Sequence, residues 1–160
     1  METRTISESK VEIAELMIPQ HANSIGLVHG GTIMKIIDTA AGIAAARHAR
    51  GTTVTASVDR IDFLHPVYIG DLVVAKASLN YVSRTSMEVG VMVVAEKFTK
   101  GLVWHVASAY LTFVALDENG KPKEVPRLKP ETPDEIRRYE EAKIRRERRI
   151  EELNRKKNRK

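Results

Sequence analysis

The stretch Gly30–Ala46, which reads GGTIMKIIDTAAGIAAA, decides the fold of this 160-residue chain. It contains no proline, and its isoleucine, methionine and alanine residues favour helix, so we predict a helix from Thr32 to about Ala49. Apolar residues occupy nearly every side of this helix. A helix of this kind has to be covered by other elements, and we expect it to be buried.

Strands on both sides of this helix can supply the cover. Runs with alternating apolar residues predict strands at Val11–Met17, Thr52–Phe63, Leu72–Val82, Ser86–Phe98 and Leu102–Ala115. In the second of these, the inward face shifts from Val54, Ala56 and Val58 to Ile61 and Phe63, which predicts an irregularity near Asp59-Arg60.

Long antiparallel strands with one apolar helix predict an α+β fold. A strongly curved sheet wrapped around the long central helix would bury it, and so would a partner subunit that covers what one sheet leaves open. The two solutions can coexist.

Residues 131–160 form a different kind of segment, a charged helical extension of a domain that we place at residues 1–130. Thr132 as N-cap, Pro133 at the first helical position and Glu135 in a capping box predict the start of a helix. Acids four residues before a base, such as Asp134/Arg138 and Glu141/Arg145, predict ion pairs along it. This segment holds 12 Lys/Arg and 8 Asp/Glu, so it accounts for +4 of the net charge of +5. The charge therefore does not indicate a nucleic-acid partner for the main domain.

Composition limits the cellular compartments in which we expect this protein. The chain has no cysteine, which excludes disulfides and thiolate zinc sites. The amino end is polar, and no apolar run approaches the ~18 residues of a membrane span. We expect a cytoplasmic protein with no membrane partner.

Asp38 is the anomaly of the central helix. A carboxylate among Ile36, Ile37 and Ala40 has to be paired, protonated or used. Lys35, three residues earlier, would provide an ion pair, so a structural role and a functional role are both open.

Two further features lie just upstream. Gly30-Gly31 opens the helix, where unpaired backbone N–H groups stabilise an anion or a developing oxyanion, although glycines also mark ordinary turns. Asn23 has an amide that either orients a water or carbonyl or satisfies loop backbone groups.

The remaining candidates concern ligand phosphates and metals. The five histidines show no metal-binding or triad spacing, so we expect no metal. His29, beside the two glycines, is the histidine best placed to contact substrate, and a plain loop role is the alternative. Arg84, Thr85 and Ser86 form either a phosphate clamp or an ordinary polar turn, and Arg60 is a further phosphate candidate.

Taken in order, several segments between about residues 11 and 126 resemble hotdog-fold acyl-CoA thioesterases of the bacterial short-chain and brain cytosolic acyl-CoA hydrolase type. They are Met17-Ile18-Pro19, Ala22-Asn23, Gly26, residues 30–41, Arg47-His48, Val54–Asp59, Phe63, Pro66, Gly70-Asp71, residues 84–89 and Thr112–Asp117. The resemblance does not cover the charged tail.

This resemblance implies a central helix wrapped by an antiparallel sheet, and homodimers commonly assembled as a trimer of dimers with active sites at the dimer interface. It implies hydrolysis of acyl-CoA to free fatty acid and CoA, with no cofactor beyond the CoA portion of the substrate. Asp38 would act as general base or nucleophile, Asn23 from the partner subunit would hold the water or carbonyl, and Gly30 and Gly31 would polarise the thioester carbonyl.

The resemblance also places the turn of Arg84, Thr85 and Ser86 on the CoA-binding surface. The alternative from a different functional class is an acyl-CoA-sensing hotdog module whose basic tail binds nucleic acid. A purely structural oligomer would leave Asp38 with no purpose beyond Lys35.

Overall fold

The computed structural model describes residues 1–159. In chain order its elements are β1 (Thr3–Thr5), η1 (Ile6–Glu8), β2 (Val11–Leu16), η2 (Pro19–His21), α1 (Gly30–Ala49), β3 (Thr53–Phe63), β4 (Leu72–Val82), β5 (Ser86–Lys97), β6 (Leu102–Ala115), β7 (Arg127–Lys129) and α2 (Pro133–Lys157).

The main sheet has five antiparallel strands in the order β2-β4-β5-β6-β3. The predicted strands are confirmed, and their ends agree within one residue. The parallel pair of β1 and β7 was not predicted, because three residues are too few to show an alternating pattern. The predicted irregularity in β3 is confirmed by two register shifts, one between Thr55 and Ser57 and one between Val58 and Arg60.

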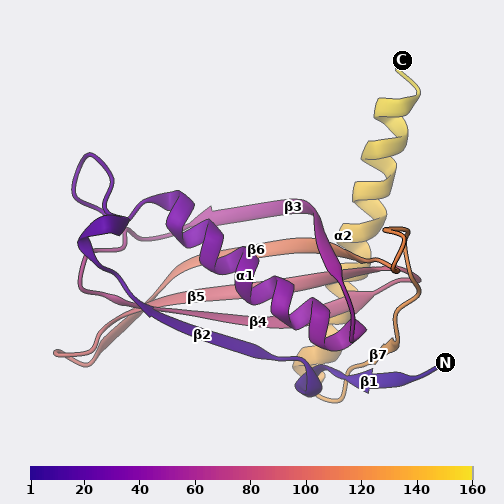
Figure 1. Ribbon diagram of the computed structural model, residues 1–160, viewed down its shortest axis with the longest axis horizontal. Coiled ribbons are helices and arrows are strands. Elements are labelled where there is room, and N and C mark those ends of the chain that lie inside the picture. Colours follow the sequence, from indigo (N-terminus) through magenta and orange to yellow (C-terminus); the bar gives the residue numbers. More distant parts are fainter. Residues whose placement is uncertain (160) are drawn as a thin grey trace.

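Helix α1 lies along one face of the sheet and the sheet wraps around it, as predicted (Figure 1). The core forms between one side of α1 and the inward residues of β4, β5 and β6. The buried residues of α1 are Ile33, Ile36, Ile37, Ala40, Ala41, Ala44, Ala45 and His48. Those of the sheet include Val73, Ala75, Leu79, Met87, Val89, Val93, Ala107, Leu111 and Phe113.

The prediction that α1 is buried all round is wrong for the single chain. Its other side is exposed along a stripe that contains Met34, Lys35, Asp38, Ile43 and Arg47. Beside this stripe runs β3, the edge strand of the sheet, with Val58 and Phe63 also exposed. The sheet curves around one side of the helix only. A partner subunit, the other way of burying the helix that the sequence predicts, would therefore have to cover the exposed face.

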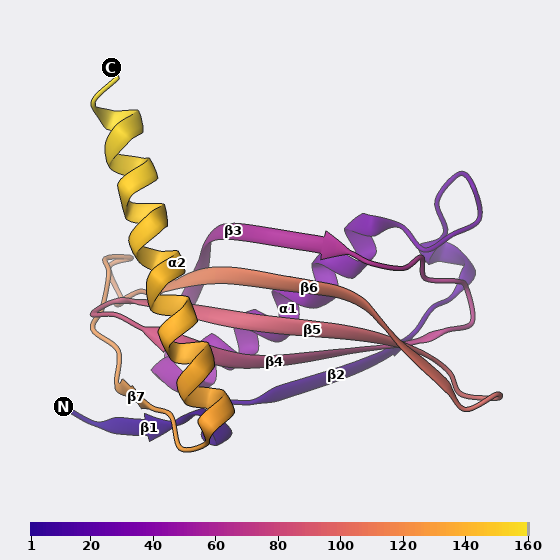
Figure 2. The same ribbon diagram turned by 180° about the vertical axis from the view of Figure 1, so that it is seen from behind.

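Helix α2 crosses the opposite face of the sheet, and its last turns extend beyond the edge of the sheet (Figure 2). The predicted capping box is confirmed, because the Thr132 side chain accepts from the backbone N–H of Glu135 at 3.1 Å. The predicted Glu141/Arg145 ion pair is wrong. Glu141 pairs with Arg137, while Arg145 reaches Glu88 of β5 at 2.7 Å, since the sheet offers it a buried carboxylate.

Within residues 1–159, neither helix is long and apolar enough to cross a lipid bilayer.

Candidate active site

Asp38 lies on the exposed side of α1, in its third turn. Its Oδ1 accepts a 2.7 Å hydrogen bond from the hydroxyl of Thr55 on β3. Among residues 1–159 no ion pair joins it to Lys35. The expectation that Asp38 is buried is therefore wrong for the single chain, because Asp38 belongs to the uncovered stripe. Of the two roles left open by the sequence, the ion pair with Lys35 is not found in the described chain, and the partner of Asp38 comes from the edge strand instead.

Thr55 was not identified from the sequence. We predicted Val54 and Ala56 on the inward face of this strand, but the register shift between Thr55 and Ser57 reverses the alternation, and Thr55 faces α1 instead. Thr55 pairs with Phe113 on the neighbouring strand β6, so the two side chains lie on the same face of the sheet. That face is the one toward α1, because a Cβ added at Gly42 of α1 would lie 3.5 Å from the Phe113 ring. A single sequence does not show at which residue a bulge occurs, so it could not show that the Thr55 side chain faces α1.

The start of α1 offers two unused donors. His29 is the N-cap and makes no side-chain cap, and Thr32 N–H donates to His29 O at 2.9 Å. In the described chain neither the Gly30 N–H nor the Gly31 N–H donates a hydrogen bond. A cavity of about 240 Å³ opens beside this turn, lined by Val28, Gly30, Ile33 and residues 63–67. Two free N–H groups at a helix start, next to a cavity, can bind the oxygen of a polarised carbonyl.

Asn23 braces its own loop. Its Oδ1 accepts from the backbone N–H groups of Ile25 and Leu27, both at 3.1 Å. Its side-chain amide donates no hydrogen bond within residues 1–159, and nothing there joins Asn23 to Asp38. The predicted role in satisfying loop backbone groups is therefore confirmed for the amide oxygen, and the role in orienting a water or carbonyl stays a prediction for the NH₂ group.

The predicted phosphate contacts do not meet Asp38 within one chain. The turn that contains Arg84 and Ser86 lies at the far end of the sheet from the first turn of α1 (Figure 1). The Arg84 side chain is 78% exposed and lies 3.7 Å from Glu124. Arg60 pairs with Asp62 at 2.7 Å on the exposed edge strand. Only His29, at the start of α1, adjoins the glycines as predicted.

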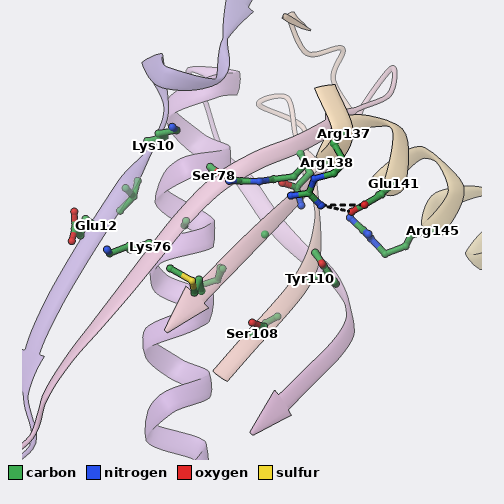
Figure 3. Close-up of a pocket in the computed structure, with 17 residues that line it drawn as sticks. Lys10, Glu12, Lys76, Ser78, Ser108, Tyr110, Arg137, Arg138, Glu141 and Arg145 are labelled. Carbon is green, nitrogen blue, oxygen red and sulfur yellow. Dashed lines mark hydrogen bonds and ion pairs between the residues drawn. The ribbon is translucent and has the colours of Figure 1, made fainter. Parts of the chain in front are cut away.

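A larger cavity, about 610 Å³, lies elsewhere, between α2 and the outer face of the sheet. Figure 3 shows arginines of α2, among them Arg138 and Arg145, above strands that carry Ser78 and Tyr110. Asp38, Asn23 and Gly30 do not line it. Cavity size alone therefore does not locate the site that Asp38 and the helix start define.

The family of the chain follows from its relatives. Residues 25–101 match the Thioesterase superfamily. The uncharacterized acyl-CoA thioester hydrolase YkhA of Bacillus subtilis is 43% identical over 159 residues, which cover 99% of this chain and 88% of that protein. The cytosolic acyl coenzyme A thioester hydrolase of Mus musculus is 40% identical over 144 residues, 89% of this chain but 38% of the longer mouse protein.

Solved structures agree. An acyl-CoA hydrolase from Staphylococcus aureus, in complex with butyryl coenzyme A, has a TM-score of 0.90 and 39% identity, covering 98% of this chain and 95% of that one. An apo-hexameric acyl-CoA thioesterase has a TM-score of 0.92 and 35% identity, covering 96% and 98%. The fold is thus that of the hotdog thioesterases. The chain belongs to the Thioesterase superfamily, among relatives named as acyl-CoA hydrolases.

Proposed function

We propose that this protein hydrolyses acyl-CoA thioesters to a free fatty acid and CoA, with Asp38 as the catalytic carboxylate. The contact between Thr55 and Asp38 supports this proposal most directly. It holds one oxygen of a carboxylate on the exposed stripe of α1, the helix whose first two N–H groups have no acceptor within residues 1–159.

A relative supports the same residues. Variants of the Staphylococcus aureus acyl-CoA hydrolase replace an asparagine, an aspartate and a threonine with alanine. The three replaced positions are separated by 15 and 17 residues, which is the spacing of Asn23, Asp38 and Thr55 here. The matching spacing supports Thr55 as the counterpart of the third replaced residue.

The proposed reaction uses Asp38 in one of two ways. As general base it removes a proton from water, the resulting hydroxide attacks the thioester carbonyl, and the C–S bond breaks as the tetrahedral intermediate collapses. As nucleophile it attacks the carbonyl itself and forms an anhydride that water then hydrolyses. In both cases the N–H groups of Gly30 and Gly31 stabilise the oxyanion, and CoA leaves as the thiolate, which takes up the proton.

Thr55 would orient the carboxylate in either route. Its hydroxyl donates to Oδ1, which leaves Oδ2 to face the water or the carbonyl. A carboxylate held in one orientation loses less entropy on reaching the reactive geometry, so this contact would act on kcat.

We further propose that the site is completed by a second copy of the chain. Asp38 comes eight residues after Gly30, or about 12 Å along the helix axis at about 1.5 Å per residue, so a single chain leaves the site open between them. The uncovered stripe of α1 and the edge strand β3 form the face that a homodimer would bury. Asn23 would reach Asp38 from the partner subunit, through its unused NH₂ group.

A trimer of such dimers fits the relatives, two of which are hexameric thioesterases. In this assembly His29 would contact the acyl-CoA near the glycines. Arg84, Thr85 and Ser86 would meet its phosphates on a neighbouring chain, since their turn lies far from the first turn of α1 within one chain. Arg60 would be a further phosphate contact, from β3.

No observation favours the alternative of a sensing module with a nucleic-acid-binding tail. Four arginines of α2 form ion pairs with carboxylates of the same chain, namely Arg137, Arg138, Arg145 and Arg149. Their charge is therefore already used within the fold.

A thioesterase assay tests the proposed function. Release of free CoA is followed with a thiol reagent across acyl-CoA substrates of increasing chain length, for the wild-type protein and for Asp38→Ala. We expect Asp38→Ala to lose about 10²–10⁴-fold in kcat, as expected for loss of a general base. A variant that hydrolyses at the wild-type rate would contradict the assignment of Asp38.

A further inference from the structure

Helix α2 is built into the outer face of the sheet over its first four turns. Ala142 is fully buried, and the ring of Tyr139 packs on that of Tyr81 with 4.9 Å between centroids. The guanidinium of Arg145 lies 3.8 Å from the ring centroid of Tyr110 (Figure 3). The segment is therefore a structural part of the domain that contains Asp38, on the opposite side of the sheet.

Two arginines of α2, one turn apart, bind carboxylates on different strands. Arg145 donates to both oxygens of Glu88 on β5, at 2.7 and 3.2 Å, and Glu88 also accepts from Asn80 at 3.1 Å. Arg149 instead donates to Asp59 on β3 at 3.2 Å, and to the hydroxyl of Thr112 on β6. Arg145 thus holds the centre of the sheet, whereas Arg149 holds its edge.

Asp59 is the point where the irregular part of β3 is fastened. It follows Val58, after which the second register shift occurs, and its carboxylate accepts from Ser57 at 3.0 Å, from Thr112 at 3.3 Å and from Arg149. These donors come from three elements, β3, β6 and α2. The side chains of Asp59 and Arg149 are 22% and 23% exposed, so their charges attract each other more strongly than those of a fully exposed ion pair.

The same irregular segment begins with Thr55. The first register shift follows Thr55 directly, and Asp59 lies four residues further on. Within one chain β3 has a neighbour, β6, on one side only. Bulged residues lack regular ladder hydrogen bonds, so side-chain contacts have to decide where this segment lies. At the start of this segment Thr55 contacts Asp38 of α1, and near its end Asp59 contacts Arg149 of α2.

We propose that Arg149 is a positioning residue for the thioesterase site: through Asp59 it holds the bulged segment of β3 so that the Thr55 hydroxyl stays on Asp38. The proposal rests on the proposed function of Asp38. Arg149 itself touches neither substrate nor reacting atoms. Its effect is therefore on kcat, because a displacement of about 1 Å in a catalytic contact can cost on the order of 10²-fold in rate.

A matched pair of variants tests this. Arg149→Met and Arg145→Met each keep a long aliphatic side chain and each remove one partly buried ion pair between α2 and the sheet. We expect about a 10-fold fall in kcat for Arg149→Met, with KM little changed, and a kcat within about twofold of wild type for Arg145→Met. Unfolding midpoints, measured alongside, should fall in both variants.

A double-mutant cycle separates positioning from a general loss of stability. If Arg149 acts through Thr55, Arg149→Met should lower kcat in the wild-type background but not further in a Thr55→Val background. Arg149→Lys should restore part of the rate, since a lysine retains the charge but not the forked geometry.

Three results would count against the proposal. Equal kcat values for Arg149→Met and the wild type would overturn it, as would equal losses in Arg149→Met and Arg145→Met. Full additivity with Thr55→Val would do the same. If the wild-type protein released no CoA from any acyl-CoA, the proposed function would fall, and the positioning role with it.

Discussion

The hydroxyl of Thr55 donates a 2.7 Å hydrogen bond to Oδ1 of Asp38, which joins the edge strand β3 to the exposed side of α1. Within residues 1–159 this is the only side-chain hydrogen bond between β3 and α1. Their contact gives the first prediction.

Replacing Thr55 with valine removes the hydroxyl and keeps the shape of the side chain. We expect kcat to fall about 10- to 100-fold, which corresponds to the about 1.5–3 kcal/mol typical of a hydrogen bond to a charged group. Steady-state release of CoA measures the change. Thr53→Val, the same substitution two residues earlier on β3, serves as control and should keep the wild-type kcat.

Mixed oligomers test whether Asn23 and Asp38 act across a subunit boundary. Asn23→Ala and Asp38→Ala proteins are each expected to be inactive alone. After unfolding and refolding together, about a quarter of the sites should be intact, since half of the dimers are mixed and each mixed dimer has one complete site. No recovery of activity on mixing would mean that the two residues act within one chain.

A charged residue on β3, beside the exposed stripe of α1, should separate the subunits of the proposed dimer. Val58 on β3 is 49% exposed in the single chain and belongs to the face that a dimer would bury. We expect Val58→Asp to give a smaller species by light scattering and to lose CoA release, because an unpaired carboxylate is costly to bury. Leu153→Asp, near the free end of α2, should leave both properties unchanged. A fully assembled, active Val58→Asp protein would argue against this interface.

His48 makes stability depend on pH. It is 1% exposed, its Nε2 donates to the Pro126 carbonyl at 2.9 Å, and its buried Nδ1 has no hydrogen-bond partner among residues 1–159. Burial lowers the pKa of His48 from its ordinary value of 6.5. The unfolded chain therefore binds the proton first as the pH falls, so the contribution of His48 to stability is complete above pH 6.5 and is lost progressively below it.

The corresponding measurement is denaturant unfolding at pH values from 7.5 down to 5, a range chosen to bracket the ordinary pKa of histidine. The free energy of unfolding should decrease with falling pH in the wild type and decrease less in His48→Gln, whose amide can still donate to Pro126. Parallel curves for the two proteins would show that His48 does not titrate in this range.

Much of the architecture could be predicted because it depends on local patterns. The alternation in Leu72–Val82 and Leu102–Ala115 reflects which side of a strand is buried, and the structure confirms the bounds of both strands. The capping box at Thr132 and Glu135 depends on residues three apart, so it too could be predicted. The site residues Asp38, Asn23, Gly30 and Gly31 were predicted partly from such local patterns and partly from the resemblance to a known family.

The rest could not be predicted, because it depends on residues far apart in the chain. Thr55 and Asp38 meet only because the register shift in β3 turns Thr55 toward α1. Arg145 was expected to pair along its own helix, yet Glu88, 57 residues away, is its partner. A helical period says which residues share a face but not which surface that face meets.

The sequence by itself determined the α+β class, the order of the long strands and the helix that carries Asp38, because burial imposes a period on each element separately. Tertiary structure alone decided that α1 is covered on one side only, that Thr55 holds Asp38, and that Arg149 fastens the edge strand from behind. The physical reason is that each of these depends on strand register and on the docking of α2. Both are set by contacts between residues up to 90 positions apart, which no local pattern encodes.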